Sequence, residues 1–149
     1  MANKLTILKL GGSVITKKSK PLTFNSDSVQ KISKVIKKFN EPLIIVHGAG
    51  SFGHYYAKRY RISDKPTKST NHVVKIRDSM QLLNQKLVKI FHKNNVNTFS
   101  FSPMYMYHNK KIINNWQSTL KKSISLDSVS YTHLRAHETE ADLVCRLLL

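Results

Sequence analysis

The stretch LIIVHGAGSFGH, residues 43–54, places four consecutive apolar residues and a histidine before a cluster of three glycines. The apolar run predicts a buried strand, and the glycines predict a turn at its end. An earlier stretch, LTILKLGGS at residues 5–13, has the same order of an apolar run and a glycine pair, which also predicts a buried strand. Between them, residues 25–39 carry apolar side chains at helical spacing, with Ser26 or Asp27 as the expected N-cap. A strand, a helix and a strand within about fifty residues predict a βαβ unit whose two strands are parallel.

Further apolar patterns extend the prediction to the rest of the chain. A polar stretch, residues 61–71, predicts a mobile loop. Apolar residues at helical or alternating spacing on either side of this loop indicate three helices, a third strand and a hairpin. These elements are expected at Tyr55–Tyr60, Val73–His92, Val96–Ser102, Met104–Ile113 and Gln117–Leu126.

The size and composition of the chain fit one compact domain, since 40% of its 149 residues are hydrophobic. The sequence has no apolar run long enough to suggest a membrane span, and its N-terminus lacks the pattern of a signal peptide. The single cysteine, Cys145, allows neither a disulfide framework nor a cysteine-based metal site. We therefore expect a reduced, cytoplasmic protein without a membrane partner.

The chain is strongly basic, with 25 Lys and Arg against 8 Asp and Glu and a formal net charge of +17. Such a balance is frequent in nucleic-acid-binding proteins. However, several lysines recur three or four residues apart in predicted helices, which indicates a solvated face, and no aromatic residues interleave with them as in RNA-binding motifs. Nucleic acid is therefore not the expected partner, and a basic nucleic-acid-binding protein is kept as an alternative. Anionic, phosphate-rich substrates would explain part of the positive charge.

The last segment, VSYTHLRAHETEADLVCRLLL at residues 129–149, differs in character from the rest of the chain. It resembles the translation of a library adapter used in DNA sequencing. We therefore expect residues 1–128 to be a truncated N-terminal part of a domain, and residues 129–149 to be a non-native tail. The competing interpretation is a native amphipathic helix with potential metal ligands, namely His133, His137, Glu138 and Cys145. The adapter interpretation is preferred, so no metal-binding residue is assigned.

The two glycine turns are the feature that carries chemistry. Glycine lets backbone N–H groups approach phosphate oxygens closely, and a helix that begins there adds its positive end. Two such turns at the ends of neighbouring parallel strands suit phosphoryl transfer between two anions. The spacing Gly48-x-Gly50-x-x-Gly53 also matches a dinucleotide-binding fingerprint, but it lies on the second strand and no acidic ribose ligand follows. The P-loop pattern is absent from the sequence.

The segments Lys9–Ser13 and His47–His54 are similar to the two glycine motifs of the amino-acid-kinase superfamily, and Ser-Phe-Gly-His at 51–54 resembles the isopentenyl phosphate kinases within it. The similarity runs from residue 5 to about 126. It implies an α/β fold, the three-layer αβα sandwich of the amino-acid-kinase fold, with only the N-terminal half present. It also implies ATP-dependent phosphorylation of isopentenyl phosphate to isopentenyl diphosphate with Mg²⁺, in the alternative mevalonate pathway of isoprenoid biosynthesis, and a possible homodimer.

The resemblance also implies roles for individual residues. Lys9 would contact the ATP phosphates, Lys18 would stabilise the transferred phosphoryl group, and His54 would hydrogen-bond the phosphate of the substrate. Lysines supply point charges and an imidazole N–H can donate to a phosphate, so these residue types fit the chemistry. The ATP-binding residues would be Lys9, Gly11, Gly12, Ser13 and Gly50. The substrate-binding residues would be Gly48, Ala49, Gly53 and His54, with Met80 as a candidate for contact with the prenyl tail, against the alternative of an ordinary core position.

The sequence departs from the family pattern in three ways. Ala49 replaces a glycine, which the backbone tolerates if φ is negative there, and Lys17 stands where relatives often have an acidic residue. The family is also about twice as long, so the chain is expected to be an incomplete copy, inactive alone. The remaining alternatives are a kinase of the same fold with a phosphonate, carboxylate or nucleotide acceptor, and a chain without function because truncation exposes a sheet edge.

Overall fold

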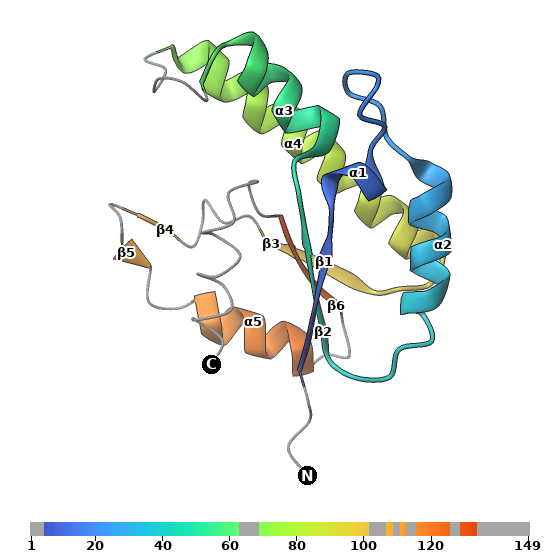
Figure 1. Ribbon diagram of the computed structural model, residues 1–149. Coiled ribbons are helices and arrows are strands. Elements are labelled where there is room, and N and C mark those ends of the chain that lie inside the picture. Colours follow the sequence, from blue (N-terminus) through green and yellow to red (C-terminus); the bar gives the residue numbers. More distant parts are fainter. Residues whose placement is uncertain are drawn as a thin grey trace.

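The computed structural model describes residues 5–62, 69–101, 107–108, 111–112, 116–125 and 129–133. Its central element is a parallel four-stranded sheet in the order β1-β2-β6-β3 (Figure 1). The strands of this sheet are β1 (Thr6–Leu10), β2 (Leu43–His47), β3 (Thr98–Phe101) and β6 (Val129–His133). A separate antiparallel pair is formed by β4 (Tyr107–His108) and β5 (Lys111–Ile112), within the predicted hairpin.

Helices lie on both sides of the sheet and complete a three-layer αβα arrangement, as expected (Figure 1). The helices are α1 (Gly12–Ile15), α2 (Ser26–Ile36), α3 (Gly50–Arg59), α4 (Thr70–Lys93) and α5 (Trp116–Ser125). In Figure 1, α2 and α4 lie on one side of the sheet and α5 on the other. Among the described residues, no helix is both long and apolar enough to cross a membrane.

The predicted βαβ unit is present, with β1 and β2 as parallel neighbours and α2 between them in the chain. The N-cap of α2 is Asn25 and not Ser26 or Asp27, because the Asn25 side chain accepts a hydrogen bond from the Ser28 N–H. The helix ends at Ile36, three residues before the predicted end at residue 39, and the side chains of Val35 and Phe39 in the predicted segment are 70% and 43% exposed.

Three further expectations are corrected. Strand β1 is not buried along its length: Leu10 is buried, whereas Ile7 and Lys9 are exposed, because β1 is an edge strand of the described sheet and alternate side chains point to opposite faces. Helix α3 begins inside the glycine cluster at Gly50 and not at Tyr55. Helix α4 begins at Thr70, within the segment expected to be a loop, whose residues 63–68 lie outside the described part of the chain.

The predicted non-native tail begins within the sheet. The backbone of β6 pairs in parallel with β2 on one side and with β3 on the other. Strand pairing uses backbone groups that almost every residue type offers, so the position of β6 does not distinguish a native segment from an adapter-derived one. The tail therefore stays a prediction, and its residues 134–149 lie outside the described part of the chain.

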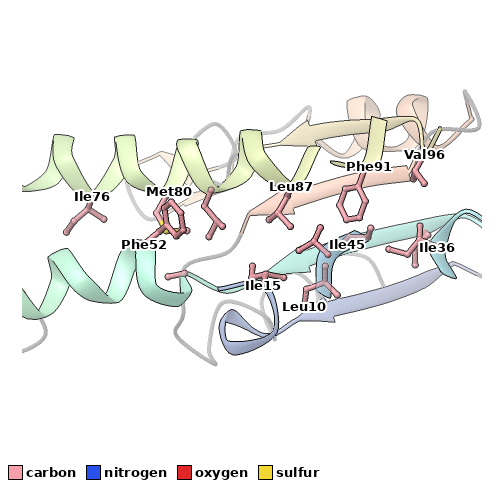
Figure 2. Close-up of a cluster of buried hydrophobic side chains, with 14 residues drawn as sticks. Leu10, Ile15, Ile36, Ile45, Phe52, Ile76, Met80, Leu87, Phe91 and Val96 are labelled. Carbon is pink, nitrogen blue, oxygen red and sulfur yellow. The ribbon is translucent and has the colours of Figure 1, made fainter. Parts of the chain in front are cut away.

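The main hydrophobic core lies between the sheet and the helices α2, α3 and α4. Figure 2 shows the side chains of α4 pointing toward the sheet and α3, with Phe52 of α3 beside Met80. Strand β2 is buried at every position, so it is the centre of this packing. The fully buried large side chains of the core include Ile15, Ile45, Phe52, Leu83, Leu87 and Phe91.

Two leucines of α4 provide a matched test of this core. Leu87 is 0% exposed and Leu82 is 44% exposed. We expect Leu87→Ala to lower the free energy of unfolding by about 2–5 kcal/mol, because it removes buried methyl groups and leaves a cavity. Leu82→Ala should change it by less than about 0.5 kcal/mol, since that side chain is largely in solvent. Urea unfolding followed by circular dichroism measures both, and equal losses would contradict the packing described.

Candidate functional site

The candidate site begins where β1 and β2 end side by side. Leu10 and His47 are paired in register, and the Gly48 N–H donates to the Leu10 carbonyl at 3.1 Å. The glycine turns that follow therefore leave the sheet at the same level. A Cβ placed on Gly12 would lie 2.6 Å from the Gly50 Cα, so the two turns are in direct backbone contact, as the sequence predicted.

The second turn depends on one glycine with a left-handed backbone. Gly50 has a φ of +49°, which side-chain-bearing residues rarely adopt. Its neighbour Ala49 has a φ of −70°, the negative value that an alanine in place of the usual glycine requires. The departure from the family pattern at residue 49 therefore costs no backbone strain.

A pocket of about 580 Å³ opens beside these turns. Its walls come from both glycine turns, from the loop after α1 and from one face of α3. The lining residues are Gly12, Ser13, Lys18, Ser19, Pro21, Gly50, Ser51, His54, Tyr55 and Lys58. This set contains two lysines and a histidine but no Asp or Glu, so the lining favours an anion.

The basic side chains of the lining come from two directions. Lys18 lies on the loop, whereas His54 and Lys58 are four residues apart on α3 and share one helix face. All three side chains are exposed, and they can therefore reach a ligand in solution. On the same helix, Arg59 Nη1 donates to the Tyr55 hydroxyl at 3.2 Å, and this hydrogen bond raises the pKa of Arg59.

The structure brings together about half of the residues expected at the site. Lys18, His54, Gly12, Ser13 and Gly50 all line the pocket. The other expected residues, which do not line it, are Lys9, Gly11, Gly48, Ala49, Gly53 and Met80.

Two of these residues, Lys9 and Met80, lie in surroundings unlike those of the pocket. Lys9 is exposed on the face of β1 that does not carry the buried Leu10. Met80 is 4% exposed within the core cluster, and a Cβ on Gly53 would lie 2.9 Å from its sulfur. Met80 therefore fills the space that Gly53 leaves between α3 and α4, which is the core position weighed as the alternative.

The sequence reasoning missed Lys58, Ser19, Pro21, Ser51 and Tyr55 as lining residues. For Lys58 a signal was present, because it follows His54 by one helical turn. Lys58 could be predicted as a lining residue only if the helix was known to begin at Gly50, before the expected start at Tyr55. In the described part of the chain, no group of three His, Cys, Asp or Glu side chains could hold a metal ion.

The known proteins to which this chain is similar include several isopentenyl phosphate kinases. The isopentenyl phosphate kinase of Methanothermobacter thermautotrophicus is 48% identical over 63 residues, which are 41% of this chain and 24% of that protein. That of Methanocaldococcus jannaschii is 42% identical over 65 residues, 38% of this chain and 25% of that protein. A crystal structure of an isopentenyl phosphate kinase substrate complex superposes with a TM-score of 0.73 at 23% identity, over 87% of this chain and 53% of the other.

The chain thus covers about half the length of this solved structure. At 23% identity, that structure supports the fold alone. A sequence model described as the amino acid kinase family matches residues 4–133, which is most of the chain. The chain belongs to the amino acid kinase family.

Proposed function

We propose that this chain supplies the acceptor-phosphate site of an isopentenyl phosphate kinase. The observation that carries the proposal is the pocket, in which the backbones of two glycine turns meet Lys18, His54 and Lys58 without an opposing carboxylate. Relatives with this name are 48% and 42% identical over segments of 63 and 65 residues. Because the chain spans about half of a matched structure, the activity is assigned to the full-length product of the gene.

The proposed reaction joins two phosphates. An oxygen of isopentenyl phosphate attacks the γ-phosphorus of ATP, a new P–O bond forms, and the bond between that phosphorus and the bridging oxygen breaks as ADP leaves. A phosphate monoester has its second pKa at about 6, so its nucleophilic oxygen is already deprotonated at neutral pH. The site needs charge neutralisation and positioning, and no general base. A lining of cations without carboxylates suits this requirement.

Each basic residue of the lining has its own role in the proposed reaction. His54 donates a hydrogen bond to the acceptor phosphate, and Lys58, one helical turn further along α3, offers it a positive charge. Lys18 approaches from the loop and stabilises the charge on the transferred group. The backbone N–H groups near Gly12 and Gly50 contribute further donors, and the positive end of α3 adds to them.

ATP is the proposed donor, in keeping with the kinase relatives. Lys9, Gly11, Gly12, Ser13 and Gly50 stay the proposed contacts for its phosphates. The pocket lining contains no acidic ligand for Mg²⁺, so no step is assigned to the metal here. In kinases generally, Mg²⁺ is held largely by the phosphates of the nucleotide. Homodimerisation likewise stays a prediction.

The first experiment assays the full-length gene product for transfer of phosphate from ATP to isopentenyl phosphate. We expect His54→Ala to lower kcat/KM by about 100-fold, because it removes a hydrogen-bond donor from the reacting phosphate. His92→Ala is the control, since His92 is exposed near the end of α4 and contacts the Thr98 carbonyl at 3.1 Å. The proposed acceptor would be wrong if the unmodified protein left isopentenyl phosphate unchanged. Phosphorylation of a carboxylate, a phosphonate or a nucleotide in the same assay would identify the acceptor instead.

A second experiment isolates the role of Lys58 in binding. We expect Lys58→Ala to weaken binding of isopentenyl phosphate about fivefold, the scale of one exposed charge pair, as measured by isothermal titration calorimetry. Lys75→Ala is the matched control, because it removes the same charge from an exposed position on α4 outside the pocket. Equal weakening in both variants would mean that binding depends only on the net charge of the protein. Lys58 would then not be a specific contact for the phosphate.

A further inference from the structure

Thr16 lies between the two glycine turns and joins them. Its side chain is 1% exposed. The Thr16 hydroxyl donates to the Gly12 carbonyl at 2.6 Å and accepts from the Ser51 N–H at 2.9 Å. One hydroxyl group therefore connects the turn after β1 with the first turn of α3, although Thr16 and Ser51 are 35 residues apart in the chain.

Ser51 extends this connection to the loop that carries Lys18. Its hydroxyl accepts from the Thr23 N–H at 3.2 Å and donates to the Thr23 carbonyl at 3.3 Å. The Ser51 carbonyl also accepts from the Leu22 N–H at 3.3 Å. The loop is closed at its base by a hydrogen bond from the Lys17 N–H to the Thr23 carbonyl at 2.9 Å. Lys18 thus sits on a loop whose two ends are both tied to α3.

Steric fit makes the connection specific to these residues. A Cβ on Gly50 would collide with the Thr16 hydroxyl and would lie 2.6 Å from its methyl carbon. The Thr16 side chain thus occupies space that only a glycine at position 50 leaves open. Burial of the hydroxyl also means that water does not readily replace a lost partner, so its hydrogen bonds are costly to break.

We infer that Thr16, together with Ser51, is a positioning residue that holds Lys18 at a set distance from the glycine turn at the start of α3. This inference rests on the proposed function. Phosphoryl transfer depends mainly on the placement of charges around the transferred group. A misplacement of about 1 Å can lower a rate by about 100-fold. Thr16 touches neither phosphate in this account and acts through the loop and the turn that it joins.

The test compares Thr16→Val with Thr16→Ser in the full-length protein. Valine keeps the shape but removes both hydrogen bonds, and we expect kcat to fall by about 10- to 100-fold. Serine keeps the hydroxyl and should restore kcat to within about threefold of the unmodified protein, since the hydrogen bonds are retained. Amide hydrogen exchange at Ser51 should be faster in Thr16→Val, because its N–H loses the acceptor, and normal in Thr16→Ser.

A double-mutant cycle separates positioning from stability. If Thr16 acts through Lys18, then Thr16→Val should cost far less in a Lys18→Ala background than alone. Thr98→Val is the matched control, because Thr98 also donates from its hydroxyl to a backbone carbonyl, that of Val96 at 2.9 Å, and lies on β3 outside the pocket lining. All variants are assayed well below their melting temperatures, so that loss of folded protein does not contribute.

Each outcome has a distinct meaning. A Thr16→Val protein whose kcat matches that of Thr98→Val would overturn the positioning role while leaving the kinase activity in place. Full additivity of Thr16→Val and Lys18→Ala would also overturn it. An unmodified protein that transfers no phosphate to isopentenyl phosphate would show that the proposed function is wrong, and the positioning role would fall with it.

Discussion

The two glycine turns approach each other so closely that neither Gly12 nor Gly50 has room for a Cβ. This contact follows from parallel strands that end in register, Leu10 opposite His47. It places the C-terminal end of β1 beside the start of α3, so that backbone groups of both turns lie in one place. Any side chain at either glycine would separate the turns and open the pocket that they share with the loop carrying Lys18.

The surroundings of this contact explain why it is stable. Strand β2, directly beneath the second turn, is buried at every position, and Phe52 of α3 is anchored in the core beside α4. The polar side of the same helix carries His54 and Lys58 into the pocket. Helix α3 is therefore amphipathic in a functional sense: one face packs the core and the other offers positive charge.

Much of the fold follows from local patterns in the sequence. The apolar runs before each glycine turn predicted β1 and β2, and helical spacing predicted α2 and α4, because both signals depend on neighbouring residues alone. The start of α3 was missed, since glycine is a poor helix former and only tertiary packing places Gly50 in a helix. The exposure of Lys9 depends on the strand order, which local patterns do not contain. The bridge from Thr16 to Ser51 likewise depends on a contact between distant segments.

An NMR titration of the ¹⁵N-labelled chain with isopentenyl phosphate measures directly whether the two glycine turns share one pocket. If the two turns share one pocket for the reacting phosphates, the amide signals of Gly12, Ser13, Gly50 and Ser51 will shift together when the acceptor phosphate binds, with a single dissociation constant. These residues line one pocket, so one bound phosphate should affect all of them. Shifts confined to one turn, or spread over the lysines of α2 with the turns unaffected, would contradict the account.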